Sequence, residues 1–86
     1  MKKTRKVVVS EEVRNFMYKI TYEQQKKLYL AIKNLGTDPL PLRAEKIPNT
    51  TGSFRFVVDD FRILYEIEGT VVRVEAIRLS SMESSF

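Results

Sequence analysis

Apolar and polar residues alternate through the second half of the chain, and this alternation predicts β-strands. Successive side chains of a strand point to opposite faces, so a period of two separates a covered face from an open one. The alternation occupies residues 53–58, 61–68 and 71–78, with Asp59-Asp60 and Gly69-Thr70 as the turns between them. We therefore predict an antiparallel meander of three strands.

The same period assigns most large apolar side chains to one face of the meander, which must be covered. That covered face is predicted to hold Phe54, Phe56, Val58, Phe61, Ile63, Tyr65, Ile67, Val72, Val74 and Ala76. The open face is predicted to hold Val57, Leu64, Glu66, Glu68, Val71, Glu75 and Ile77, together with Arg55, Arg62 and Arg73. Each strand thus places one guanidinium group on the open face.

A helical period in the first half predicts two short antiparallel helices, joined by almost no loop, that cover the sheet. Val7-Val8-Val9 is β-branched and predicts a preceding strand. Ser10 is a candidate N-cap, Thr21 with Gln24 has the spacing of a capping box, and Gly36 stands where a helix commonly ends in a left-handed residue. The two apolar stripes are Val13, Phe16, Met17, Ile20 and Leu28, Ala31, Ile32, Leu35.

Between residues 37 and 52 the periodicity stops, and three prolines mark a long connection that is either ordered against the sheet or functional. We predict one α+β domain over residues 1–86, with residues 1–4 and 80–86 frayed. Its two N-terminal helices pack on one face of a small, mainly antiparallel four-stranded sheet in the order β-α-α-β-β-β.

Composition narrows the chemistry. The 86 residues contain no cysteine and no histidine, which excludes the usual zinc sites and the Ser-His and Cys-His nucleophile pairs. We expect no metal and no cofactor. Lys plus Arg number 15 against 11 Asp plus Glu, and the net charge of +4 favours an acidic or polyanionic partner. No run is long enough for a signal peptide or a membrane span, so we expect a cytoplasmic protein without a membrane partner.

The order of elements resembles the RelE/ParE superfamily of type II toxin-antitoxin toxins over nearly the whole chain. Phe54-Arg55-Phe56, residues 60–67 (Asp-Phe-Arg-Ile-Leu-Tyr-Glu-Ile) and Val71-Val72-Arg73-Val74 carry the resemblance. The resemblance implies a bacterial toxin whose partner is a cognate antitoxin. It also implies, for the RelE branch, metal-independent cleavage of messenger RNA (mRNA) on the ribosome.

The resemblance further implies site residues. Arg62 matches an arginine that stabilises the attacked phosphate in RelE-type enzymes, and Arg55 matches a cation on the same face; both are candidate catalytic residues. A fixed guanidinium can contact two phosphoryl oxygens as their charge grows. Lys46, Arg73 and Arg78 are candidate RNA-binding residues. The structural alternative for Arg62 is a surface ion pair with Glu66 or Glu75, which contributes only about 0–1 kcal/mol.

The C-terminal end departs from the pattern. After the last strand, RelE-like enzymes usually have Gly, followed by His or Lys, then Arg, and a few residues later Tyr. In this chain the corresponding stretch is Arg78-Leu79-Ser80-Ser81, and Phe86 lies near the position of the tyrosine. Arg78 either replaces the missing cation or is a solvent-facing residue at the end of a strand. Spacing selects no proton carrier among Lys46, Glu66, Glu75 and Glu83.

Three functions stay open at this point. The first is a RelE-like endoribonuclease, the second a ParE-like inhibitor of DNA gyrase without nuclease activity, and the third a catalytically degenerate toxin that only binds antitoxin. In each, an exposed sheet edge, apolar open-face residues and a hydrophobic groove beside the helices invite a strand or an amphipathic helix from the partner.

Overall fold

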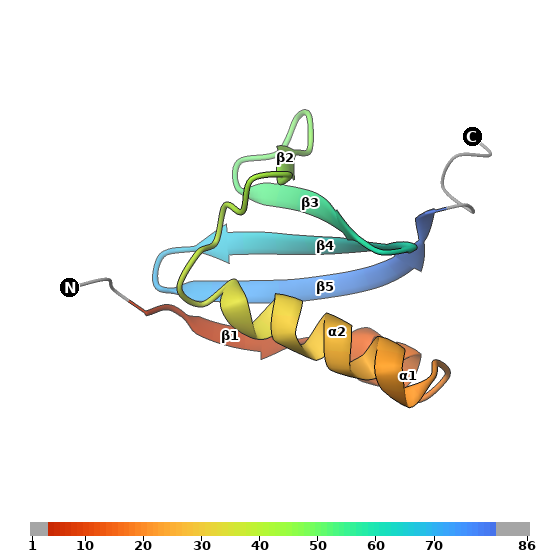
Figure 1. The fold of residues 1–86 in the computed structure, drawn as a ribbon. Helices are drawn as coiled ribbons and strands as arrows, with labels where there is room; N and C mark the ends of the chain where they lie inside the picture. The colour runs from red at the N-terminus through yellow and green to blue at the C-terminus, as the bar shows by residue number, and fades with distance from the viewer. Residues whose placement is uncertain (1–3, 81–86) are drawn as a thin grey trace.

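The computed structural model describes residues 4–80 and shows two helices packed on one face of a five-stranded sheet (Figure 1). In chain order the elements are β1 (Lys6–Val9), α1 (Glu11–Met17), α2 (Tyr22–Asn34), β2 (Glu45–Lys46), β3 (Ser53–Val58), β4 (Phe61–Glu68) and β5 (Val71–Leu79). The predicted α+β class is confirmed. Of the ends predicted to fray, residues 1–3 and 81–86 lie outside the described part, and the Ser80 N–H donates to the Asp60 carbonyl at 2.8 Å.

The strand order is β1-β5-β4-β3-β2, with β1 parallel to β5 and the other pairs antiparallel. The predicted count of four strands was therefore one too low. The fifth strand is β2, two residues of the proline-containing connection that pair with Phe54 and Arg55. Two residues are too short to show a period of two, which is why the alternation could not reveal this strand.

The helices begin where their caps predict. The Ser10 hydroxyl accepts from the Val13 N–H at 3.1 Å, so Ser10 is the N-cap of α1. Thr21 and Gln24 form the predicted capping box of α2, with reciprocal bonds of 3.0 and 3.2 Å. From this cap α2 runs back over the sheet, opposite in direction to β1 (Figure 1).

The two apolar stripes and the covered face of the sheet meet in one core. Its helical part consists of Val13, Leu28, Ile32 and Leu35. Its part from the sheet consists of Phe56, Phe61, Ile63, Tyr65, Val72, Val74 and Ile77. The helices thus seal one side of the meander, and among residues 4–80 no helix packs on the other side, called the uncovered face below (Figure 1).

The register of β4 with β5 contains a β-bulge. Tyr65 lies opposite Val74 and Leu64 lies opposite Ala76, so Glu75 is an extra residue on β5. An extra residue exchanges the two faces for the rest of its strand, because side chains alternate with a period of two. The last residues of β5 therefore point to the sides opposite to those that unbroken alternation predicts.

Two predicted orientations were wrong for this reason. Ile77, predicted on the open face, lies opposite Ile63 and is 4% exposed in the core. Ala76, predicted on the covered face, lies opposite Leu64 on the other side of the sheet. Both residues are buried, Ala76 at 5% exposed, but the bulged register points the larger apolar side chain into the core beneath the helices.

Gly36 does not adopt the predicted left-handed conformation. The C-cap of α2 is Leu35, with a right-handed φ of −62°, and Gly69 is the described glycine with a positive φ. Gly36 instead permits a close approach of β1, since its carbonyl accepts from the Arg5 N–H at 2.7 Å. A Cβ at this position would lie 2.9 Å from the Arg5 carbonyl oxygen and 3.2 Å from Val7 Cγ2.

Gly36→Ala is expected to lower the free energy of unfolding by about 2 kcal/mol, the usual cost of overpacking a closed site. The clash is with backbone, so β1 must shift or the new methyl group must strain the chain. Urea denaturation of the variant and of Lys33→Ala, an exposed change in the last turn of α2, measures the difference. Equal stability of the two variants would contradict the close approach.

Candidate anion site and partner groove

The uncovered face of the sheet gathers three arginines from three adjacent strands, here called the arginine cluster: Arg55, Arg62 and Arg78. Arg62 of β4 and Arg78 of β5 are directly opposite each other, a geometry that places Cβ atoms about 4.5–5.5 Å apart. Arg55 of β3 is the diagonal neighbour of Arg62, because Val57 is the residue opposite Arg62. The three side chains therefore start from one small area of the sheet.

Two glutamates on this face pair with Arg73 and Arg55. Glu66, one predicted ion-pair partner of Arg62, accepts a hydrogen bond from the Arg73 guanidinium at 3.0 Å. Glu45 of β2 lies at the outer side of the cluster, with its carboxylate 3.7 Å from Arg55 Nε. Arg73 and Arg55 thus each lie beside a carboxylate of a neighbouring strand.

The structure separates two predicted RNA-binding residues from the cluster. Arg73 lies nearer the start of β5, opposite Glu66. Its guanidinium is 3.0 Å from the Glu66 carboxylate and 3.3 Å from that of Glu68, so two carboxylates neutralise it. Lys46 lies opposite Phe54 and therefore on the helix side of the sheet. Of the five predicted site residues, Arg55, Arg62 and Arg78 come together, whereas Arg73 and Lys46 do not.

The chemistry that this arrangement supports is stabilisation of a phosphate. Guanidinium groups stay charged at neutral pH and present fixed pairs of donors that fit phosphoryl oxygens. Of the candidate proton carriers, Glu75 is exposed at the bulge, Glu66 is held by Arg73, and Glu83 lies outside the described residues. Among residues 4–80 no cluster of three or more metal-ligating side chains is present, and no helix is long and apolar enough to cross a membrane.

Tyr65 is a core residue, as the alternation predicted. Its side chain is 1% exposed and its ring stacks on Phe54, with centroids 5.8 Å apart. The phenol donates to the Pro39 carbonyl at 2.7 Å and so fixes the proline-containing connection to the core. Burial, and secondarily the nearby Asp38 carboxylate, raise the pKa of Tyr65 from 10.0 to about 12.

This pKa predicts an alkaline loss of stability. Between pH 10 and 12 the unfolded chain releases the Tyr65 proton while the folded chain keeps it, so the free energy of unfolding falls as the pH rises. The expected loss is about 1 kcal/mol between pH 9 and pH 11. Urea denaturation at both pH values should show a smaller loss for Tyr65→Phe than for the wild type, whereas exposed Tyr29→Phe should behave as the wild type. If Tyr65→Phe lost as much free energy of unfolding between pH 9 and pH 11 as the wild type, the Tyr65 phenol would not be the source of the loss.

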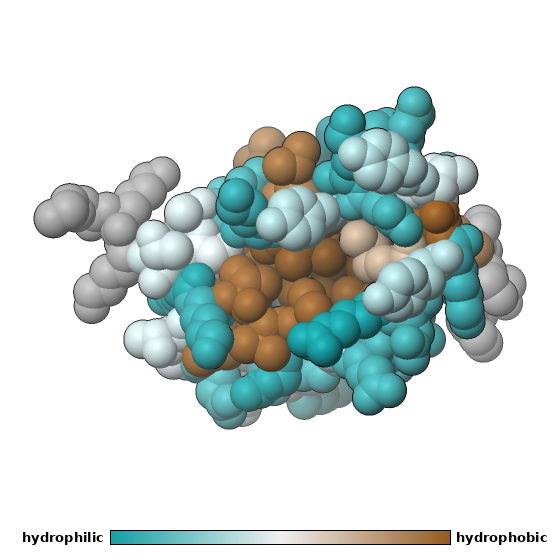
Figure 2. Space-filling model, turned by 90° about the horizontal axis from the view of Figure 1, so that it is seen from below, coloured by the Kyte–Doolittle hydropathy of each residue, from teal (hydrophilic) through white to brown (hydrophobic). Residues whose placement is uncertain are grey.

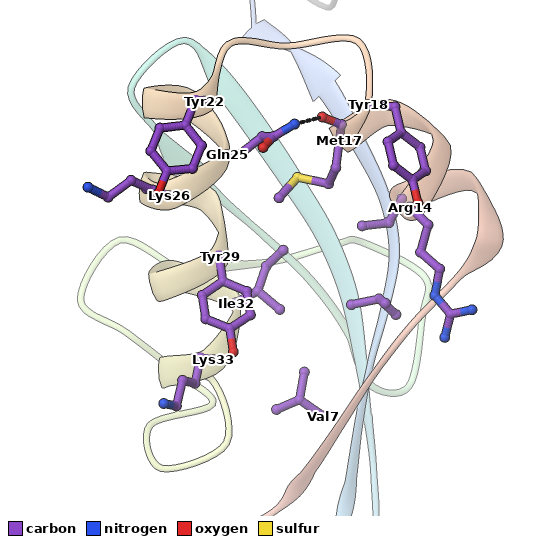
Figure 3. A pocket seen from close by; sticks show the side chains of 12 residues that line it. Val7, Arg14, Met17, Tyr18, Tyr22, Gln25, Lys26, Tyr29, Ile32 and Lys33 are labelled. Atoms are coloured by element: carbon purple, nitrogen blue, oxygen red, sulfur yellow. Dashed lines mark hydrogen bonds between the residues drawn. The ribbon is translucent and has the colours of Figure 1, made fainter.

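A groove of about 660 Å³ opens between α1, α2 and β1 on the helix side of the molecule. Figure 2 shows an apolar hollow surrounded by hydrophilic side chains. The apolar lining comes from Val7, Val9, Val13, Met17 and Ile32. At one end of the groove the Gln25 side-chain amide donates to the Met17 carbonyl at 2.6 Å and ties α2 to the end of α1 (Figure 3).

The rim of the groove combines tyrosines with cations and contains no carboxylate among the lining residues. Tyr22, Lys26, Tyr29 and Lys33 follow one another along α2 (Figure 3). Tyr22 is 72% exposed, and Lys26 Nζ lies 5.4 Å from the centre of its ring. Exposed aromatic rings beside an apolar hollow are typical of surfaces that bind another protein.

The prediction of a groove beside the helices did not identify these rim residues, although the sequence contains a signal for them. Positions 22, 26, 29 and 33 have the i, i+4, i+7, i+11 spacing of one helical stripe, and aromatic and basic residues alternate along it. The apolar stripe of α2 was the stronger pattern. The second stripe is marked by two tyrosines that lie outside the apolar stripe of the same helix.

No family model and no curated protein matches the sequence. Solved structures do match. RelE of the archaeal RelE-RelB complex from Pyrococcus horikoshii is 15% identical, with a TM-score of 0.81 over 90% of this chain and 96% of that one. A chain of the toxin-antitoxin complex RelBE2 from Mycobacterium tuberculosis is 18% identical, with a TM-score of 0.77 over 88% and 98%.

A mutant of the Escherichia coli toxin RelE in the free state is 12% identical, with a TM-score of 0.75 over 94% of this chain and 88% of that one. The likeness covers the helices and the sheet, which agrees with the resemblance found in the sequence. The chain has the fold of the RelE toxins.

Proposed function

We propose that the protein is the toxin of a type II toxin-antitoxin system, acts in the cytoplasm, and inhibits translation by cleaving mRNA on the ribosome. The observation that carries the proposal is the arginine cluster on the uncovered face of a RelE-type fold. Arg62 is its central member, with Arg55 diagonal to it and Arg78 opposite.

In the proposed reaction the 2′-hydroxyl of the message attacks the adjacent phosphorus and the 5′-oxygen of the next nucleotide leaves. Negative charge grows on the phosphoryl oxygens during this step, and the Arg62 and Arg55 guanidinium groups stabilise it. No proton carrier is fixed by the described side chains beside Arg62. The ribosome therefore supplies the alignment of the message and part of the proton transfer.

The groove is the proposed docking surface for the cognate antitoxin. Its apolar floor, tyrosine rim and cationic side chains fit an amphipathic segment with acidic residues along one margin. Two of the similar structures are the RelE-RelB complex and the toxin-antitoxin complex RelBE2. A groove on the helix side leaves the arginine cluster on the opposite side of the sheet for RNA.

Expression of the protein without a partner tests the function directly. The expected result is arrested growth, with primer extension showing cuts within translated messages. Double-strand breaks or a supercoiling defect without message cleavage would instead establish the gyrase-inhibiting alternative. Normal growth with normal accumulation of folded protein would establish the degenerate alternative and overturn the proposal.

A further inference from the structure

The bulge in β5 decides which side of the sheet receives Arg78. Without an extra residue, Arg78 would share the face of Val72 and Val74, both fully buried beneath the helices. With Glu75 as the extra residue, Arg78 moves to the uncovered face and lies directly opposite Arg62. One residue of register thus converts an arginine on the helix side into a member of the arginine cluster.

Helix α1 holds this bulge in place. The Ser10 backbone N–H donates to the Val74 carbonyl at 3.0 Å, and the Ser10 hydroxyl donates to the Glu75 carbonyl at 2.8 Å. The same hydroxyl oxygen accepts the Val13 N–H as the N-cap of α1. The bulged carbonyl therefore has a partner, and the start of a helix fixes the register that positions Arg78.

We propose that Arg78 is a second phosphate ligand, which the bulge in β5 places beside Arg62. The inference rests on the proposed function and adds a residue to its site. Guanidinium groups directly opposite each other repel, and an anion between them is attracted by both. Arg62 on β4 and Arg78 on β5 would thus bind the same phosphodiester group.

The main test moves the guanidinium of residue 78 to the neighbouring position while the net charge of the protein stays constant. In the exchange variant Arg78→Leu/Leu79→Arg the guanidinium moves to the position opposite Phe61, on the helix side, where Leu79 is already 38% exposed. Arg78→Ala removes the charge, and Arg78→Lys restores a cation without the paired donors. Circular dichroism verifies that each variant is folded.

The first measurement follows the Arg62 Nε–H signal by nuclear magnetic resonance during titration with inorganic phosphate. In the wild type the Arg62 and Arg78 signals should shift with the same apparent affinity. The phosphate affinity reported by Arg62 should fall about tenfold in Arg78→Ala and in the exchange variant, as expected for loss of a charge-assisted contact. An unchanged affinity in the exchange variant would overturn the inference.

The second measurement is the single-turnover rate of message cleavage on programmed ribosomes. We expect about a tenfold loss for Arg78→Ala and for the exchange variant, with partial recovery in Arg78→Lys. If phosphate shifts the Arg62 signal alone and both variants cleave the message at the wild-type rate, the role of Arg78 is refuted and the proposed function stands. Phosphate bound by both arginines in a protein that cuts no message refutes the proposed function and leaves the paired site standing.

Discussion

Replacing Arg62 with alanine is expected to slow mRNA cleavage at least about 100-fold, the effect typical of removing one preorganised donor from a developing oxyanion. Arg62 is the central member of the arginine cluster, diagonal to Arg55 on β3 and directly opposite Arg78 on β5. Neighbouring arginines cannot replace it, because a guanidinium reaches phosphoryl oxygens only from a suitably placed strand position.

The measurement is single-turnover cleavage on ribosomes programmed with a defined codon, using purified Arg62→Ala. Arg43→Ala is the matched control, since it removes the same charge from an exposed position in the connection before β2. The Arg62 variant should keep antitoxin binding, because the groove lies on the other side of the sheet. Cleavage at the wild-type rate would remove the arginine cluster from the mechanism.

The sequence was sufficient to predict the elements whose signals are local. Strand alternation over residues 53–74 and the caps at Ser10 and Thr21 are each determined by neighbours within a few residues. Their positions are confirmed because local and tertiary preferences agree there. The same agreement explains why the covered face of β3 and β4 was predicted correctly.

Three features were beyond local signals. The bulge at Glu75 depends on which of Ala76 and Ile77 packs better in the assembled core. Strand β2 exists only because β3 offers an edge for it. Gly36 is required by a strand distant in sequence, whose backbone approaches it after folding.

In the candidate site, too, some residues could be placed from local sequence signals and others depend on the assembled fold. Arg55 and Arg62 could be placed on one face from alternation within β3 and β4, and their diagonal register follows from the two-residue turn. Arg78 could not, because its face depends on the bulge. The groove needs α1, α2 and β1 assembled together, so the sequence could indicate that a groove exists and not which residues line it.

Reversing two charges on the rim of the groove, Lys26→Glu with Lys33→Glu, is expected to weaken antitoxin binding about 100-fold. Both lysines line the groove from α2, and no carboxylate among the lining residues offsets them. An acidic segment that lies along the rim would lose two attractions and meet two repulsions. Lys26 also lies over the Tyr22 ring, so its reversal removes a cation-π contact at the rim.

The binding partner for this measurement is the product of the neighbouring reading frame, where a short acidic protein is expected for a toxin. The control variant Arg43→Glu/Lys46→Glu makes the same change in net charge beside β2, away from the groove. Equal weakening in both variants would show that only net charge matters and would place the antitoxin elsewhere. A large effect confined to the groove variant, mainly on the dissociation rate, would locate the antitoxin there, since contacts within an interface chiefly determine how fast a complex separates.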